Sequence, residues 1–174
     1  MKNIFIDLDD VLNTFVPTYL KLLGCGDVDY KDIDPEWGYD IVGIANHLHP
    51  TPVWNSSDIW EFATQEFWAT IPESKEAGQL LVDCIDEVGR DNVYILTKPV
   101  GYPDSAGPPC VAGKVQWINE FGMGRNYVLT AHKHLCAHDS LLIDDNEDNI
   151  NSFIRAGGSG FLVPKPWNSA WRFR

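Results

Sequence analysis

The fold is decided by the stretch Asn3-Ile-Phe-Ile-Asp-Leu-Asp-Asp-Val-Leu-Asn-Thr-Phe15, in which a short apolar run leads into three carboxylates. The run contains β-branched and aromatic residues and is followed at once by turn residues, which favours a buried strand of a parallel sheet over a helix. Asp7 and Asp9 therefore lie at the carboxyl end of that strand, where open α/β sheets bind their ligands. Because neighbouring carboxylates repel one another unless they share a cation, the stretch predicts a divalent metal site, and its oxygen-only ligands favour Mg²⁺.

The alternative is an ordinary polar turn, since Asp is common in turns for local hydrogen-bonding reasons. A second acidic turn, Leu141-Leu-Ile-Asp-Asp-Asn-Glu-Asp148, has the same plan of an apolar strand that ends in carboxylates. Two such turns favour a shared cation over a coincidence. We therefore expect Asp7, Asp9 and Asp145 to surround one metal ion, although the two turns lie far apart in the chain.

Strand and helix patterns alternate along the rest of the sequence. Buried strands are predicted at residues 92–96, 127–129, 141–143 and 161–163, and helices at residues 14–23, 74–89, 113–121 and 146–156. Residues 99–112, rich in Gly and Pro, are predicted to form a loop. Alternating strands and helices imply right-handed crossovers and a parallel sheet with helices on both faces, so the fold class is α/β and Rossmann-like.

The segment from residue 27 to residue 70 has a different character, because its aromatic residues lie among Asp, Pro, His and Asn without a sustained periodicity. We interpret residues 14–70 as a small, mostly helical cap inserted after the first strand. Residues 1–13 and 71–174 then form the core. Most of the cap aromatics are expected to fill the cap's own interior, with one or two left to face a flat ligand.

The composition is that of a globular protein: 174 residues, of which 44% are hydrophobic and 22% are charged. This length predicts one domain with a sizeable core. The net charge of -12 excludes a nucleic-acid polymer as the main partner, because binding a phosphate backbone requires a basic surface. A small phosphorylated ligand is still compatible with the sequence if a metal ion, lysines and backbone N–H groups bind it locally.

No apolar run is long enough to cross a membrane, and the first strand begins without a charged leader, so we expect a cytoplasmic protein. The four cysteines are widely spaced and form no CxxC pair, which favours reduced thiols over a disulfide framework or a zinc site. The sequence leaves the oligomeric state open, a homodimer included.

These strand-end residues resemble the four motifs of the haloacid-dehalogenase-like (HAD) phosphohydrolases. Asp7-Leu-Asp-Asp-Val11 matches the first motif, DxDx(V/T), and Thr97 matches the Ser/Thr that follows the second strand. Lys133 or Lys114 matches the downstream lysine, and the pair Asp144-Asp145 matches the final acidic motif. The resemblance implies a HAD-type Rossmann-like core, a Mg²⁺ cofactor and hydrolysis of a phosphomonoester.

Longer stretches resemble successive segments of one group of these enzymes, the 5'(3')-deoxyribonucleotidases. The stretches are Asp7 to Phe15, Gly113-Lys-Val-Gln-Trp-Ile-Asn-Glu-Phe-Gly122, Val128-Leu-Thr-Ala-His-Lys133 and Leu141-Leu-Ile-Asp-Asp145. The resemblance covers the core well and the cap poorly, and Asp10 stands where this family usually has Gly. It implies a small-molecule substrate, a deoxyribonucleoside or ribonucleoside monophosphate, which is hydrolysed to nucleoside and phosphate.

The resemblance also implies roles for individual residues. Asp7 would be the nucleophile that forms an aspartyl phosphate, and Asp9 would be the general acid and base, with its backbone carbonyl on the metal ion. Asp145 would bind the metal ion directly and Asp144 indirectly or through water. Thr97 would bind a phosphoryl oxygen.

Two lysines and several aromatic residues complete the expected site. Lys133 would contact both the phosphate and Asp7, and Lys114 would be an auxiliary lysine, or else a surface residue at the start of its helix. By resemblance, Phe15 and the pair Trp60-Glu61 would line a pocket for the nucleobase. Trp37 and Tyr39 are weaker candidates for this pocket.

Three alternatives stay open at this point. A HAD-type phosphatase could act on another small phosphoester, such as a sugar phosphate, and a HAD-like domain without catalysis could serve to bind a partner. A zinc site could be formed by the cluster of His132, His134, Cys136 and His138, but ligands crowded into a short segment rarely complete a tetrahedron, and Lys133 lies among them.

Overall fold

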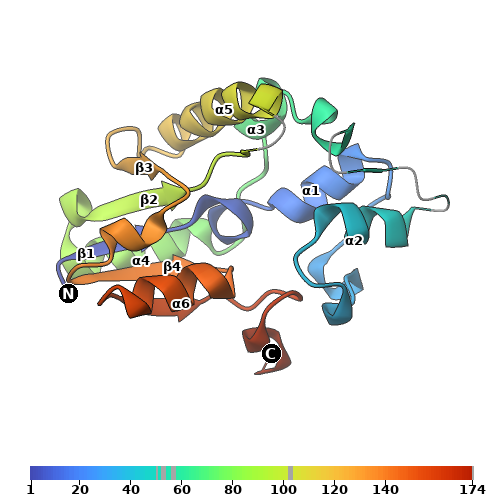
Figure 1. Ribbon diagram of the computed structural model, residues 1–174. Coiled ribbons are helices and arrows are strands. Elements are labelled where there is room, and N and C mark those ends of the chain that lie inside the picture. The colour runs from blue at the N-terminus through green and yellow to red at the C-terminus, as the bar shows by residue number, and fades with distance from the viewer. Residues whose placement is uncertain (50, 52–53, 56–57, 102–103, 174) are drawn as a thin grey trace.

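The first strand of the chain lies at the centre of a parallel sheet (Figure 1). The computed structural model describes residues 1–49, 51, 54–55, 58–101 and 104–173. Its strands are β1 (Asn3–Ile6), β2 (Val93–Thr97), β3 (Tyr127–Leu129), β4 (Ser140–Asp144) and β5 (Ser159–Leu162). Within these residues the strands form one sheet in the order β3-β2-β1-β4-β5, and every neighbouring pair is parallel. The predicted α/β class is confirmed.

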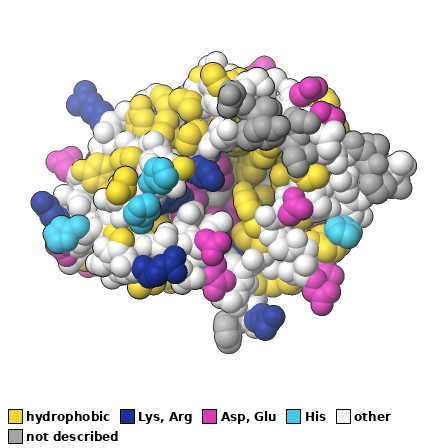
Figure 2. Space-filling view, viewed as in Figure 1, with side chains coloured by type: hydrophobic (Ala, Val, Ile, Leu, Met, Phe, Trp, Pro, Cys, Tyr) yellow, Lys and Arg dark blue, Asp and Glu magenta, His cyan; other side chains and the backbone are white. Residues whose placement is uncertain are grey.

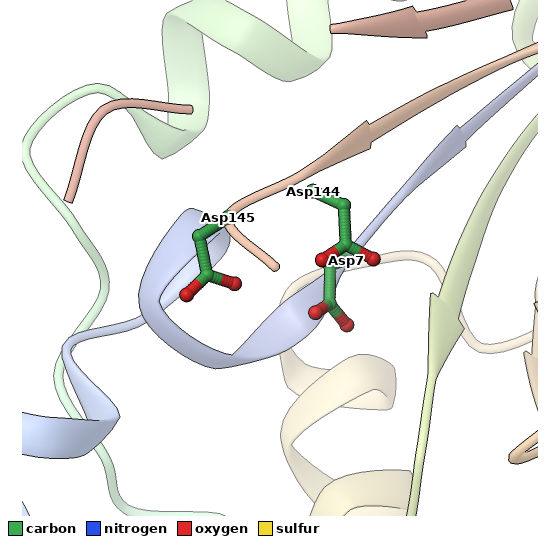
Figure 3. Close-up of side chains that lie close together, drawn as sticks. All are labelled: Asp7, Asp144 and Asp145. Carbon is green, nitrogen blue, oxygen red and sulfur yellow. The ribbon is translucent and has the colours of Figure 1, made fainter. Parts of the chain in front are cut away.

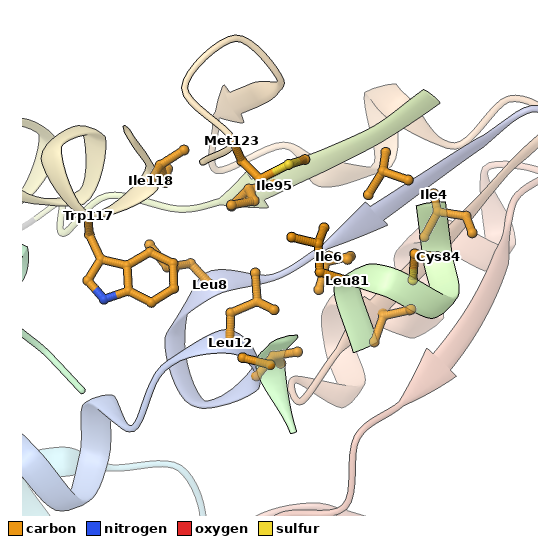
Figure 4. Close-up of a cluster of buried hydrophobic side chains, with 14 residues drawn as sticks. Ile4, Ile6, Leu8, Leu12, Leu81, Cys84, Ile95, Trp117, Ile118 and Met123 are labelled. Carbon is orange, nitrogen blue, oxygen red and sulfur yellow. The ribbon is translucent and has the colours of Figure 1, made fainter. Parts of the chain in front are cut away.

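Helices cover both faces of this sheet. Successive residues of each strand point to opposite faces, so β1 has side chains to bury on both sides. On one face, Ile4 and Ile6 of β1 belong to a buried cluster with residues of α4 (Ala77–Val88) and α5 (Gly107–Glu120), as Figure 4 shows. On the other face, Phe5 packs with residues of α6 (Glu147–Arg155). The alternating pattern of β1 therefore anchors the centre of the sheet on both sides.

The start of α5 differs from the prediction. The helix begins at Gly107, six residues before the predicted start at residue 113, so the second half of the predicted loop at residues 99–112 is wrong. Pro108 and Pro109 lie in the first turn, where a missing backbone N–H leaves no intrahelical hydrogen bond unmade. Of the predicted loop, residues 102–103 lie outside the described residues.

The segment predicted as a cap contains α1 (Phe15–Leu22), α2 (Ile41–Leu48), α3 (Gln65–Ala69) and several short 3-10 turns. Its buried apolar side chains form a cluster that also includes Ile71 and Cys110 of the core, and in which Tyr19, Leu20 and Ile44 are fully buried. Figure 1 shows α1 and α2 beside the sheet, beyond the end of β1, whereas α3 lies against α5. Of this segment, residues 50, 52–53 and 56–57 lie outside the described part. The division at residue 70 stays a prediction.

Two further features concern the chain as a whole. In the described ranges, no helix combines the length and the apolar character that crossing a membrane requires. The four cysteines are free thiols, and Cys84 and Cys110 are buried.

Candidate active site

The turn after β1 brings the two acidic stretches together. Asp7 follows the last residue of β1, and its backbone N–H donates a hydrogen bond to the carbonyl of Ile143 in β4, at 2.8 Å. The single turn Leu8–Leu12 follows, and its first N–H donates to the Asp7 carboxylate. Because β1 and β4 are neighbouring parallel strands, their acidic carboxyl ends meet at one edge of the sheet.

Asp7, Asp144 and Asp145 form a compact acidic group (Figure 3). One carboxylate oxygen of each residue lies within 4.8 Å of the others, and all three side chains are buried. Among the described residues, no other group of three or more potential ligand side chains is this compact. The carboxylate of Asp9 is not part of this group. The metal contact expected of Asp9 is therefore the one through its backbone carbonyl.

Lys133 lies between two of these carboxylates. Its Nζ atom is 2.8 Å from Oδ1 of Asp7 and 2.7 Å from Oδ2 of Asp144, and the side chain is 3% exposed. Burial alone would lower the pKa of Lys133, but the carboxylates of Asp7 and Asp144 outweigh it and raise the pKa above its ordinary value. Lys133 is therefore positively charged at neutral pH.

Lys114 holds the other carboxylate of the first turn. Its Nζ atom donates to Oδ2 of Asp9 at 2.5 Å, to Oγ1 of Thr97 at 3.0 Å and to the carbonyl of Lys98 at 2.7 Å. Because α5 begins at Gly107, Lys114 lies inside the helix rather than at its start, and its side chain is 1% exposed. The alternative of a surface lysine is wrong.

Asp144 and Asp145 differ in how their charges are compensated. Asp144 accepts hydrogen bonds from Lys133, from the backbone of Asn146 and from the side chain of Asn149. Asp145 accepts one from the indole N–H of Trp167, at 2.7 Å. The Asp145 side chain also lines the cleft described below, so its carboxylate is better placed for direct metal binding.

The charges of the site favour a divalent cation. Asp9 has Lys114 as its partner, Asp10 lies near Lys165, and Asp7 and Asp144 share Lys133, so five carboxylates face three ammonium groups. Burial raises the pKa of Asp144 to about 6 and raises that of Asp145 well above its ordinary value, and neighbouring carboxylates add to both effects. With all five carboxylates ionised, the two excess negative charges on oxygen donors match the charge and the ligand preference of Mg²⁺.

Asp10, which occupies the place of the family glycine, is not part of this group, although its charge acts on Asp145. Its φ of 58° lies in the left-handed region, which favours Gly and tolerates Asp. Its carboxylate accepts hydrogen bonds from the backbone of Val16 and the hydroxyl of Tyr30. Burial raises the pKa of Asp10 to about 7, although Lys165 counteracts this. The residue therefore ties the first turn to the cap segment.

A cleft of about 310 Å³ lies over these groups. Asp7, Asp9, Thr97, Lys114, Lys133 and Asp145 line it from the core, and Phe15, Tyr39, Trp60 and Trp68 line it from the cap segment. Figure 2 shows acidic and lysine side chains in a hollow of the surface beside hydrophobic side chains. Charged side chains of the core and aromatic side chains of the cap segment therefore line the same cleft. We call the first set its floor and the second its aromatic wall.

The cap aromatics predicted to contact substrate differ in position. Phe15 is 3% exposed and stacks between neighbours, with ring centroids 6.4 Å from Trp60 and 5.0 Å from Trp68. Tyr39 is half exposed in the cleft, whereas Trp37 stacks on a histidine and does not line the cleft. Glu61 lines a neighbouring cavity of about 680 Å³, which shares only Trp60 with the cleft.

The histidine cluster does not converge on a metal site. The rings of His132 and His134 are exposed, with centroids 5.9 Å apart, and Lys133 between them turns inward to Asp7. In the described part of the chain, no ligand group forms around these residues. The structure thus gives the zinc alternative no support.

The sequence predictions missed three residues of the site: Asn149, Trp167 and Asn168. Asn149 contacts Asp144 from α6, and Trp167 and Asn168 contact Asp145 from the segment after β5. Since β5 is parallel to β4, the segment that follows it emerges at the same edge of the sheet as the acidic turns. This position after a strand was the signal that could have indicated Trp167 and Asn168.

No protein-family model matches the sequence, and no curated protein matches it. Among solved structures, a hydrolase from Streptococcus pneumoniae TIGR4 is similar, with 12% sequence identity, a TM-score of 0.50 and 99% of each chain covered. A HAD-superfamily hydrolase from Geobacter sulfurreducens PCA has 13% identity and a TM-score of 0.49, with 95% of this chain and 90% of that chain covered.

A HAD family enzyme from Bacteroides thetaiotaomicron, solved in complex with magnesium and inorganic phosphate, has 15% identity and a TM-score of 0.46, with 100% of both chains covered. At such low identities the similarity concerns the fold. The chain thus has an α/β fold with a parallel sheet, similar to the fold of a solved hydrolase.

Proposed function

We propose that this protein is a Mg²⁺-dependent phosphomonoesterase of the HAD type that hydrolyses deoxyribonucleoside or ribonucleoside monophosphates. The observation that carries the proposal is the arrangement of Asp7 and Asp9. Their carboxylates are bound by two different buried lysines, Lys133 and Lys114, at the floor of one cleft. This arrangement would hold a nucleophile and a proton donor apart from each other in the same cleft.

Mg²⁺ fits the donor set, which offers buried carboxylate oxygens and an excess of negative charge. Asp7 and Asp145 would hold the ion, with the backbone carbonyl of Asp9, while Asp144 would act through its hydrogen bonds to Lys133 and Asn149. When bound, the ion neutralises phosphate charge and so allows a carboxylate to approach a dianionic ester.

Asp7 would attack phosphorus while the ester oxygen departs. Lys133 lies 2.8 Å from Oδ1 of Asp7 and fixes the orientation of this carboxylate. The bond between phosphorus and the ester oxygen breaks as the bond to Asp7 forms, which gives an aspartyl phosphate and an alcohol. Water then attacks the phosphorus atom of this intermediate, which releases phosphate and restores the Asp7 carboxylate.

Asp9 would donate a proton to the departing oxygen and later accept one from the attacking water. In the structure its partner Lys114 also contacts Thr97, a side chain suited to bind a phosphoryl oxygen. A phosphate bound at Thr97 brings negative charge next to Asp9 and gives Lys114 a second anionic partner. Lys114 would therefore hold Asp9 beside the phosphoryl group, where proton transfer to the departing oxygen takes place.

The aromatic wall supports a nucleoside as the leaving group. Trp60 and Tyr39 are not fully buried and line the cleft opposite the acidic floor. One stacked base contributes about 1 to 3 kcal/mol, which is enough to decide a preference among small phosphoesters.

The experiment is phosphate release from a panel of substrates, with Mg²⁺ or with a chelator. We expect release from dUMP, dTMP, dCMP and their ribonucleotide counterparts that depends on Mg²⁺ and exceeds release from sugar phosphates. Faster hydrolysis of sugar phosphates would contradict the nucleotide assignment and leave a phosphatase of another specificity. No release from any phosphoester would favour a binding domain without catalysis.

A further inference from the structure

Trp167 contacts the acidic group without carrying a charge. Its Nε1 atom donates a hydrogen bond to Oδ2 of Asp145 at 2.7 Å. In the described part of the chain, no other side chain donates a hydrogen bond to this carboxylate, whereas Asp7 and Asp144 share the ammonium group of Lys133. Asp145 is therefore held by a neutral donor rather than by an ammonium group.

The backbone around this contact is fixed by the next residue. Nδ2 of Asn168 donates to the carbonyl of Asp145 and to that of Val163, both at 2.8 Å. Its Oδ1 accepts from the backbone of Lys165 and Ala170. Asn168 is 8% exposed, and its hydrogen bonds connect the segment after β5 to the acidic turn. Trp167 therefore lies in a segment whose backbone is held in place by hydrogen bonds.

The indole ring is also held from the side of the cap. Its centroid lies 6.0 Å from that of Tyr30 and 5.2 Å from that of Tyr39, at interplanar angles of 65° and 59°. The contact with Tyr30 is edge-to-face and the contact with Tyr39 is tilted, and together they restrict rotation of the tryptophan. The direction of the N–H bond is therefore set by contacts on two sides.

Asp145 needs such a constraint, because it is 5% exposed and its neighbours Asp7, Asp144 and Asp10 repel its charge. Without a donor, its carboxylate would rotate away from Asp7 to reduce the repulsion. A lysine would prevent this but would also neutralise the charge that a cation requires. A neutral N–H orients one oxygen and leaves the other for a ligand.

We infer that Trp167 is a positioning residue for the metal site, whose indole N–H orients the Asp145 carboxylate toward Asp7 for binding of Mg²⁺. This inference rests on the proposed function. It assigns to the segment after β5 a part in metal affinity that its sequence alone does not reveal.

The test is the affinity of the substrate-free protein for Mg²⁺, measured by titration calorimetry in wild type, Trp167→Phe and Trp117→Phe. Phenylalanine keeps an aromatic ring against Tyr30 and Tyr39 and removes the N–H donor. Trp117 is the matched control, because it also donates one hydrogen bond at 2.7 Å, to the carbonyl of Ile71, and it belongs to the core cluster of Figure 4 and not to the acidic group.

We expect Trp167→Phe to weaken Mg²⁺ binding by about 10- to 100-fold, as for other residues that orient a metal ligand. Trp117→Phe should leave Mg²⁺ affinity unchanged, even if it lowers the melting temperature as much as Trp167→Phe does. With enough Mg²⁺, the turnover number of Trp167→Phe should approach that of wild type. In wild type, the indole N–H resonance that is missing from Trp167→Phe should shift when Mg²⁺ is added.

Equal Mg²⁺ affinity in wild type and Trp167→Phe would overturn the inference and leave the proposed function intact. A wild-type protein that neither binds Mg²⁺ nor releases phosphate would overturn both. Should Trp167→Phe fail to fold, Trp167→Leu also removes the N–H donor, introduces no other donor and provides the same comparison. An indole resonance of Trp167 that does not respond to Mg²⁺ would also overturn the inference.

Discussion

The Nζ atom of Lys114 lies 2.5 Å from Oδ2 of Asp9, although the two residues are 105 positions apart in the chain. The lysine is 1% exposed, so its charge has left water and depends on protein partners. Its contact to Thr97 joins the ends of β1 and β2 through one residue of α5. The position of Asp9 is therefore fixed before any substrate binds.

Lys114→Met should impair both substrate binding and turnover, because it removes the ammonium group between Asp9 and Thr97. We expect kcat to fall by about 10²- to 10³-fold, the usual effect of removing one group that stabilises developing charge, together with a higher KM. Lys75→Met is the control, since Lys75 is exposed and lies outside the cleft. Steady-state kinetics that show equal constants for Lys114→Met and Lys75→Met would remove Lys114 from the site.

Lys133→Met should destabilise the metal-free protein as well as inactivate it. The substitution leaves the carboxylates of Asp7 and Asp144 buried without their shared cation, and loss of one partner of a buried ion pair costs about 3 to 5 kcal/mol. Chemical denaturation with a chelator present measures this change, and Mg²⁺ should restore part of it. A free energy of unfolding within about 1 kcal/mol of wild type would contradict the predicted charge balance.

Metal binding and stability should depend on pH in opposite ways. Burial raises the pKa of Asp144 to about 6 and also raises that of Asp145. A carboxyl whose folded pKa exceeds its unfolded value of about 4 stabilises the fold while protonated, so without metal the free energy of unfolding should fall between about pH 4 and pH 7. Mg²⁺ binds the ionised carboxylates, so its affinity should rise over the same range.

Thermal unfolding with Mg²⁺ or with a chelator, at several pH values, checks this prediction. The increase in melting temperature caused by Mg²⁺ should be larger at about pH 8 than at about pH 5. An equal increase at both values would mean that the buried carboxyls do not compete for protons with the metal ion.

Asp10→Asn should retain activity, because Asp10 is hydrogen-bonded to Val16 and Tyr30 rather than directed at the acidic group. Asparagine has nearly the same shape, tolerates the left-handed backbone and removes the charge. We expect kcat/KM to change by less than about tenfold, which corresponds to ~1.4 kcal/mol. A loss comparable to that of Lys114→Met would show that the charge of Asp10 contributes to catalysis.

The parts of the fold that the sequence predicted are those that depend on local pattern. The short apolar strands and the acidic residues that follow them are visible within a few neighbouring positions, and parallel pairing then brings β1 and β4 together. The start of α5 was missed because Pro108 and Pro109 are typical of loops and are equally compatible with a first helical turn. Local sequence does not distinguish the two cases.

The contacts of Trp167 and Asn149 were missed for a different reason. Neither residue belongs to a motif with a known spacing, and both reach the acidic group only because β5 and α6 pack beside β4. The burial of Lys114 likewise follows from the packing of α5 on the sheet. Such contacts depend on tertiary structure, which the sequence pattern does not show.

The proposed role of Asp7 as the nucleophile is tested by trapping the phosphorylated enzyme. Wild type and Asp7→Asn would be mixed with Mg²⁺ and a deoxyribonucleoside monophosphate labelled in its phosphate, quenched in acid, and analysed for label on the peptide that contains residue 7. We predict label on Asp7 in wild type, none in Asp7→Asn, and phosphate release by wild type only. Phosphate release by Asp7→Asn at the wild-type rate would contradict the account.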